Sequence, residues 1–148
     1  MVAQLPEMEI VQILAARLEI AVVLFPIGDG VLAVGAGGFC GASLRYLVGL
    51  IPALQRGAFP LPTLLINLGG ALLIGFLAGS AQHCGAISPR LLLFLKVGLC
   101  GGFTTFSTFS LEGLGLLESG RTGLFFLYAV LSVALCLGGV WLGKQLAG

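Results

Sequence analysis

Four long apolar segments make up most of the chain, and residues typical of turns separate them. They cover residues 31–51, 61–82, 90–117 and 122–146. Proline stands at or next to several of their boundaries, as at Pro52, Pro60 and Pro89. Because a helix of about 20 apolar residues can cross the hydrocarbon core of a bilayer, each segment is long enough to span it. We therefore predict an all-α membrane protein with four transmembrane helices, in which short connections make successive helices antiparallel.

The third segment, residues 90–117, is longer than a single span requires. At 1.5 Å per residue it would reach about 40 Å, whereas the hydrocarbon core is about 30 Å thick. Its middle reads Gly101-Gly102-Phe103-Thr104-Thr105-Phe106-Ser107-Thr108-Phe109-Ser110, which is rich in glycine and hydroxyl residues. A non-helical link at membrane depth is tolerated only where protein or a cavity covers its backbone. The sequence therefore predicts a third helix that is broken mid-membrane, and a break that marks an ion pathway.

Residues 1–30 differ from the four-helix transmembrane domain that we predict over residues 31–148. Charged residues interrupt their apolar character, namely Glu7, Glu9, Arg17, Glu19 and Asp29. Ile10, Leu14 and Leu18 nevertheless recur at helical spacing, as on the apolar face of a helix that lies on a membrane surface. This N-terminal extension is predicted to be either an interfacial helix or a disordered tail.

The composition supports a bilayer as the solvent and excludes several classes of function. Of the 148 residues, 58% are hydrophobic and 9% charged, against about 25% charged in a soluble domain. A net charge of +1 does not favour a nucleic-acid partner. There is no phosphate-binding glycine loop with lysine, no nucleophile paired with histidine and no His/Cys cluster, so we do not expect an enzyme.

Basic residues are almost evenly shared between the two ends of the predicted bundle. One end carries Arg17, Arg90 and Lys144, and the other carries Arg56 and Arg121, with Arg45 close by. A clear excess of basic residues normally marks the cytoplasmic side. The near tie leaves two alternatives open. The chain has either one weakly favoured orientation or dual topology, in which two oppositely inserted copies form an antiparallel homodimer.

Small residues at four-residue spacing predict where helix backbones approach closely. The first span carries Gly37 and Gly41, and the second carries Ala71, Gly75 and Gly79. Such rows let transmembrane helices pack backbone against backbone.

Several polar residues inside the spans are candidates for an ion pathway. Arg45 is either a snorkelling side chain or a cation at the mouth of an anion path. Asn67 either holds helices together or offers its amide donors to a passing ion, since a buried amide without partners is unfavourable. Tyr128 and Ser132 lie four apart in the fourth span, which indicates a face that is turned inward. Lys96 can snorkel to the interface, and the pattern gives it no function.

The third span presents two different faces just beyond its break. At 100° per residue, Phe106, Phe109 and Ser110 project to one side, and Thr105, Thr108 and Glu112 project to another. Neutral donors suit a small anion that must be held weakly enough to leave. Carbonyl groups that the break frees suit a small cation such as Na⁺. The residues thus indicate an ion site of mixed polarity without naming the ion.

Three motifs resemble those of the Fluc (CrcB) fluoride channel family. They are Gly37-Gly38-Phe39-Cys40-Gly41-Ala42-Ser43-Leu44-Arg45-Tyr46, Thr63-Leu64-Leu65-Ile66-Asn67-Leu68-Gly69-Gly70, and the long run from Gly98 through Gly101-Gly102-Phe103-Thr104-Thr105-Phe106 to Glu112. The resemblance covers residues from about 31 to 146, and the third motif is the most specific. It implies a multi-pass protein of the cell (inner) membrane that exports fluoride passively and lowers its toxicity in the cytoplasm. It also implies an antiparallel, dual-topology homodimer with two fluoride pores.

The same resemblance assigns roles to individual residues. Backbone carbonyls of Gly101 and Thr104 would hold a structural Na⁺ at the dimer interface. The fluoride pathway would be lined by Asn67, Phe106, Phe109, Ser110, Tyr128, Ser132 and Arg45. The alternative is a small dual-topology coupled exporter, either multidrug-type or a fluoride/proton carrier. A multidrug-type exporter needs a glutamate in its first span, and residues 31–51 contain no carboxylate.

Overall fold

The computed structural model describes the backbone of residues 7–83 and 87–148, and the side chains of residues 28–82 and 87–148. The chain divides into two compact units, residues 1–32 and residues 33–148, and each is described by itself. In the first unit the backbone is helical from Glu7 onward. Whether residues 1–30 form an interfacial helix depends mostly on side chains outside the described residues, so that alternative stays a prediction.

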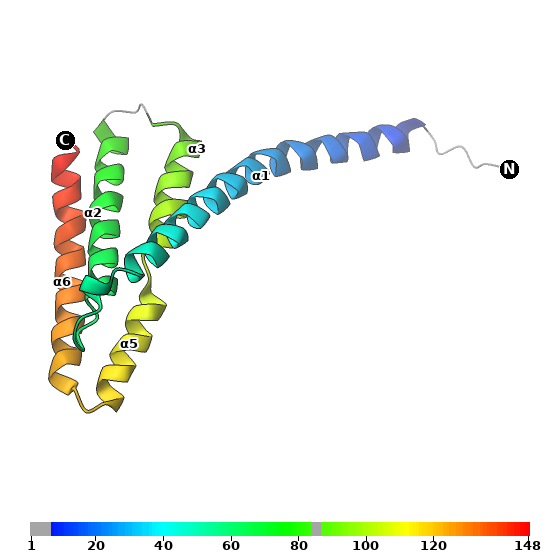
Figure 1. Ribbon diagram of the computed structural model, residues 1–148. Coiled ribbons are helices and arrows are strands. Elements are labelled where there is room, and N and C mark those ends of the chain that lie inside the picture. Colours follow the sequence, from blue (N-terminus) through cyan, green and yellow to red (C-terminus); the bar gives the residue numbers. More distant parts are fainter. Residues whose placement is uncertain (1–6, 84–86) are drawn as a thin grey trace. The chain divides into compact units, whose positions relative to one another are not determined.

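The described residues form helices joined by short links (Figure 1). In chain order these are α1 (Glu7–Gly49), η1 (Pro52–Leu54), α2 (Leu61–His83), α3 (Pro89–Leu92), η2 (Leu93–Cys100), α4 (Gly101–Phe103), α5 (Phe106–Glu118) and α6 (Thr122–Leu146). Four segments are long and apolar enough to cross a membrane: Gly28–Gly49, Leu61–Gln82, Pro89–Glu118 and Thr122–Leu146. The predicted all-helical architecture with four candidate spans is therefore confirmed.

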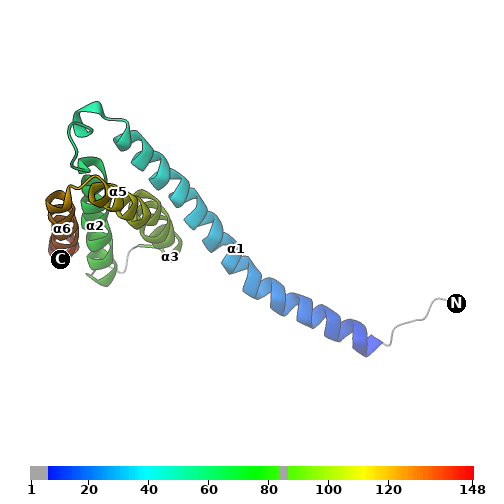
Figure 2. The ribbon, with the colours of Figure 1, turned by 90° about the horizontal axis from the view of Figure 1, so that it is seen from below.

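Helices α2 and α6 lie side by side along most of their length (Figures 1 and 2). A Cβ atom at Gly75 would overlap the carbonyl oxygen of Val140, and one at Gly143 would overlap that of Leu72. The two backbones therefore touch, and this contact is possible only because neither glycine carries a side chain. The close packing predicted for the row that contains Gly75 and Gly79 is confirmed.

The part of α1 that belongs to the second unit packs in the same way against η2. A Cβ atom at Gly37 would overlap the carbonyl oxygen of Phe94, and one at Gly41 would overlap that of Leu99. These are the two glycines that the four-residue spacing singled out in the first span. The first and third spans thus approach each other backbone to backbone on the side of the break that holds η2.

The third span is interrupted more narrowly than the ten-residue motif suggested. Only Thr104 and Thr105 leave helical geometry, with extended backbone angles (φ −77°, ψ 156° and φ −151°, ψ 123°). Before them, η2 is wound as a π-helix over eight residues. The hydrophobic pattern of the sequence does not distinguish this stretch from an α-helix. The break lies near the middle of Pro89–Glu118, and Figure 1 shows α3 and α5 on either side of it.

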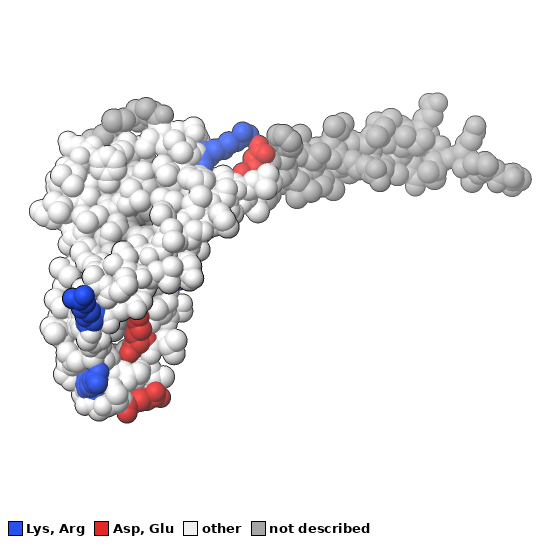
Figure 3. Space-filling model, viewed as in Figure 1, with Lys and Arg blue, Asp and Glu red and all other residues white. Residues whose placement is uncertain are grey.

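A buried cluster fixes α5 and α6 against the start of α2. Leu64, Leu116 and Tyr128 form its centre, and Phe59 and Phe109 pack against them. Between α5 and α6 the chain turns at Gly120, whose φ of 72° is readily adopted only by glycine. Most of the face in Figure 3 carries no charged side chain, in keeping with a protein whose solvent is lipid.

Candidate ion pathway

The side chain of Asn67 closes the break in the third span. Its Oδ1 accepts a hydrogen bond from the backbone N–H of Thr105 (2.8 Å), and its Nδ2 donates to the Thr105 carbonyl oxygen (3.1 Å). A backbone amide that leaves a helix inside a membrane needs a partner, because no water is there to satisfy it. Asn67 supplies that partner for both backbone groups of one residue. The interpretation of Asn67 as a group that holds helices together is thus confirmed.

The break also frees the two carbonyl groups that were predicted to hold Na⁺. In a continuous helix the N–H of Thr105 would donate to the Gly101 carbonyl, and the N–H of Thr108 to the Thr104 carbonyl. Instead, the first donates to Asn67 and the second to the Thr105 hydroxyl (3.2 Å). Both oxygens lose their regular partners, and carbonyl oxygen is a suitable ligand for a small hard cation. Gly101 and Thr104 therefore fit the predicted cation site.

A first cleft of about 700 Å³ opens on the side of the break that holds α5. Arg45 from α1 and Arg121 from the α5–α6 turn line it, and so do Thr105, Thr108 and Glu112. The predicted face of hydroxyls and a carboxylate therefore does border one common space. Because two cations and one carboxylate are its charged residues, the lining has a net positive charge.

Glu112 is held by hydroxyl groups from two other helices. Its Oε1 accepts from Thr63 of α2, and its Oε2 accepts from Tyr128 of α6, each at 2.8 Å. Tyr128 has no exposed surface, and its ring lies against Phe59 and Phe109 with centroid distances of 5.6 and 4.9 Å. This network links three helices on the α5 side of the break.

A second cleft of about 600 Å³ lies along the other side of the break. Asn67, Phe106, Phe109 and Ser132 line it, and so does Thr105, which also lines the first cleft. The residue whose backbone leaves the helix therefore borders both clefts. A path between the two clefts would run beside Thr105.

The predicted phenyl face borders this second cleft. The rings of Phe106 and Phe109 are 5.5 Å apart at their centroids, and Phe106 is 78% exposed. The hydrogen-bearing edge of a phenyl ring is electropositive, so such a pair can face an anion. A large apolar ring this exposed also requires cover, either from lipid or from another protein surface.

The two predicted serines have different surroundings. Ser110 is exposed, lines neither cleft, and donates its hydroxyl to the Phe106 carbonyl (2.9 Å). Ser132 is buried in the wall of the second cleft, and its oxygen has no hydrogen-bond partner. Of the two, Ser132 has the hydroxyl that is free to meet an ion.

The structure adds residues that the sequence analysis did not place on the pathway. Lys96 and Cys136 line the second cleft, and Thr63 binds Glu112. The spacing of Cys136, four residues after Ser132, was a signal for one shared helix face. The link from Thr63 to Glu112 joins residues 49 positions apart, which helical periodicity cannot reveal.

Comparison with known proteins identifies the group to which this architecture belongs. The family model described as "CrcB-like protein, Camphor Resistance (CrcB)" matches residues 32–144. The chain belongs to the CrcB family. The match begins within the first candidate span and ends within α6, so it contains the break and both clefts.

Three CrcB relatives share the name "Fluoride-specific ion channel FluC". One from Ruminiclostridium cellulolyticum is 48% identical over 118 residues, covering 79% of this chain and 91% of the relative. One from Rhizobium meliloti is 48% identical, covering 78% and 94%. One from Chlorobium phaeobacteroides is 43% identical, covering 78% and 91%. These names describe ion channels rather than enzymes, and the predicted family is confirmed.

Proposed function

We propose that this chain is a fluoride-selective ion channel that lets fluoride leave the cell passively and so lowers its concentration in the cytoplasm. The observation that carries the proposal is the name shared by relatives that are 43–48% identical over about nine-tenths of their own length. The clefts on the two sides of the break provide a physical basis for it.

Neutral hydrogen-bond donors replace the water shell of fluoride along this path. Asn67 uses one of the two hydrogens on Nδ2 to bind Thr105, which leaves the second for an ion in the cleft. Ser132 contributes an unpartnered hydroxyl, and Phe106 and Phe109 contribute ring edges. Such donors bind a small anion without the strong fixed charge that would trap it.

The remaining predicted residues act at the ends of the path or through their neighbours. Arg45 attracts anions into the first cleft, where Arg121 adds to its field. Tyr128 donates to Glu112, so it joins the path only when that hydrogen bond exchanges for one to fluoride. Ser110 must likewise release the Phe106 carbonyl before its hydroxyl is available.

The channel works as an antiparallel, dual-topology homodimer. A second copy would cover the exposed ring of Phe106, and the near tie of basic residues between the two ends permits insertion in both directions. The freed carbonyls of Gly101 and Thr104 hold a structural Na⁺ at the dimer interface. That ion would supply a fixed positive charge, which keeps two carbonyl-lined breaks together.

Fluoride efflux from liposomes that contain the purified protein tests the proposal. Fast release of fluoride, with no release of chloride, is expected once a K⁺ ionophore removes the membrane potential. A flux that depends on a pH gradient would instead support the coupled exporter. Phe106→Ile is expected to reduce the flux sharply while the dimer stays intact, and no fluoride release from wild-type protein would refute the function.

A further inference from the structure

The second cleft contains one charged side chain, that of Lys96. The other residues that line it are uncharged, and most of them are apolar. The polar ones lie at the break and on α6, together with Asn67 of α2. Within the described parts of the chain, no carboxylate forms an ion pair with Lys96, and its side chain is exposed. Apolar walls focus the field of a charge in a cleft, so this ammonium group gives the space a positive potential.

Another residue that lines this cleft, Ser132, has a hydroxyl that lacks a partner. Ser132 is 8% exposed, and its oxygen makes no hydrogen bond. A hydroxyl buried in this way is unfavourable unless something binds it. Cys136 lies four residues further along α6, about 6 Å along the helix axis and on the same face, and its thiol also lines the cleft.

These side chains select for the charge of a ligand. A lysine ammonium group has three donors and no acceptor, a serine hydroxyl donates readily, and a thiol donates weakly. The freed carbonyls of Gly101 and Thr104, which are proposed to hold Na⁺, line the same cleft at the break, but none of Lys96, Ser132 and Cys136 is a carboxylate that would attract a cation. A small monovalent anion is therefore the chemical class that fits between Lys96, Ser132 and Cys136.

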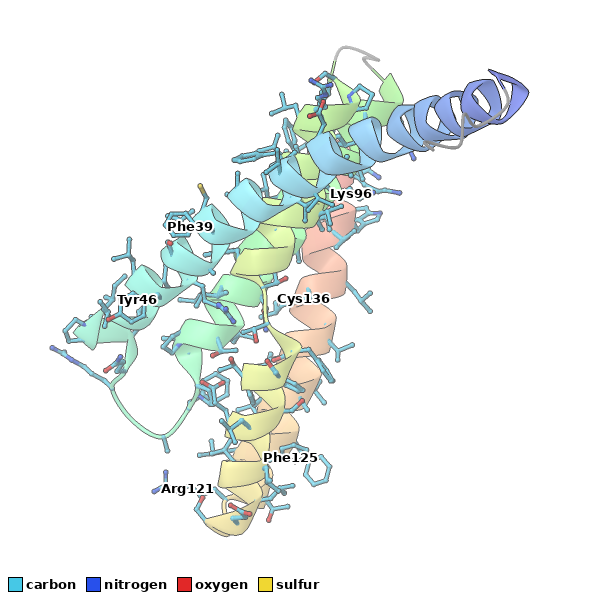
Figure 4. All side chains as sticks on the ribbon, turned by 90° about the vertical axis from the view of Figure 1, so that its right-hand side faces the viewer. Phe39, Tyr46, Lys96, Arg121, Phe125 and Cys136 are labelled. Atoms are coloured by element: carbon cyan, nitrogen blue, oxygen red, sulfur yellow. The ribbon has the colours of Figure 1, made fainter. Side chains whose placement is uncertain are left out.

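Lys96 and Arg121 lie toward opposite ends of the bundle. In Figure 4, Cys136 lies between the level of Lys96 and that of Arg121. Arg45 and Arg121 line the first cleft, Lys96 lines the second, and Thr105 lines both. Each cleft thus has its own cationic side chains, and Thr105 at the break borders both clefts.

We propose that Lys96, Ser132 and Cys136 form an anion-binding position in the second cleft, where Lys96 attracts the ion and α6 guides it to the break. This inference rests on the proposed fluoride conduction. It gives the path a cation at both of its ends. It also gives Lys96 a function in ion attraction, in addition to snorkelling to the membrane interface.

The test compares initial fluoride efflux of Lys96→Met, Lys96→Arg and wild-type protein in liposomes, at low and at high concentration of an impermeant salt. Lys96→Met should reduce the rate about threefold or more at low salt, and the deficit should shrink at high salt because screening removes the attraction. Lys96→Arg should restore most of the rate. Lys144→Met is the matched control, because Lys144 lies in the last turn of α6 and lines neither cleft.

Three results would overturn the inference. Equal rates for Lys96→Met and wild-type protein at both salt concentrations would remove Lys96 from the path while leaving fluoride conduction intact. A deficit that salt does not change, together with a lower melting temperature of the dimer, would show a structural role. Absence of fluoride release from the wild-type protein would refute the proposed function, and this inference with it.

Discussion

Replacing Asn67 by alanine should open the break that this side chain closes. The change leaves the N–H and the carbonyl oxygen of Thr105 without the two hydrogen bonds that they make now. A buried polar group left unpaired costs about 1–3 kcal/mol, so the pair should cost about 2–6 kcal/mol. Because 1.4 kcal/mol is a factor of ten, even the lower limit shifts the folded equilibrium by about 30-fold.

The assay combines stability with a local readout. Unfolding of the purified protein in detergent can be followed by the fluorescence of its single tryptophan, and hydrogen–deuterium exchange reports on the Thr105 amide. Asn67→Ala should lower stability and speed exchange at Thr105. Asn67→Asp keeps the acceptor for that amide but removes the donor to its carbonyl, so exchange should stay slow while stability falls less.

Leu65→Ala provides a matched control, because Leu65 lies on the same helix, is 40% exposed, and is therefore expected to change stability little. The reasoning is refuted if Asn67→Ala leaves both the exchange rate of Thr105 and the unfolding transition as they are in the wild-type protein. In that case the break would be held by its own geometry rather than by α2.

Three further changes test other parts of the structure. Tyr128→Phe should lower the free energy of unfolding by about 1–3 kcal/mol, since it leaves one oxygen of the half-buried Glu112 carboxylate without its protein partner, whereas Tyr46→Phe at an exposed position should change nothing measurable. Gly75→Ala should reduce the yield of folded protein in a size-exclusion assay, because its Cβ would overlap the α6 backbone; Gly138→Ala has open space and should behave as wild type. A thiol reagent should slow fluoride efflux by labelling Cys136 in the second cleft, and full sensitivity in Cys136→Ser would contradict that assignment.

Much of this arrangement could be predicted from the sequence, because bilayer thickness limits the length of a helix. The excess length of residues 90–117 predicted the break. Rotation by 100° per residue separated Thr108 and Glu112, which line the first cleft, from Phe106 and Phe109, which line the second, whereas Thr105 lines both clefts and Ser110 lines neither. Glycine spacing likewise predicted the close approach of backbones. These features depend on one helix at a time.

The features that could not be predicted depend on how two helices meet. Asn67 pairs with a residue 38 positions away, so its contact with Thr105 follows from the packing of α2 against the third span. Periodicity alone therefore left the role of Asn67 open between holding helices together and binding an ion. The π winding of η2 and the lining of the second cleft by Lys96 also had no signature in the hydrophobic pattern.

The contact between α2 and α6 has a consequence for how the protein is made. The ribosome releases α2 well before α6, and the entire third span enters the membrane between them. Until α6 arrives, the glycine face of α2 has no backbone to pack against, and Ser132 has not reached the wall of its cleft. Assembly of the bundle must therefore finish from its C-terminal end. A chain truncated before α6 should insert into the membrane but should not mature, and should be a substrate for membrane quality control.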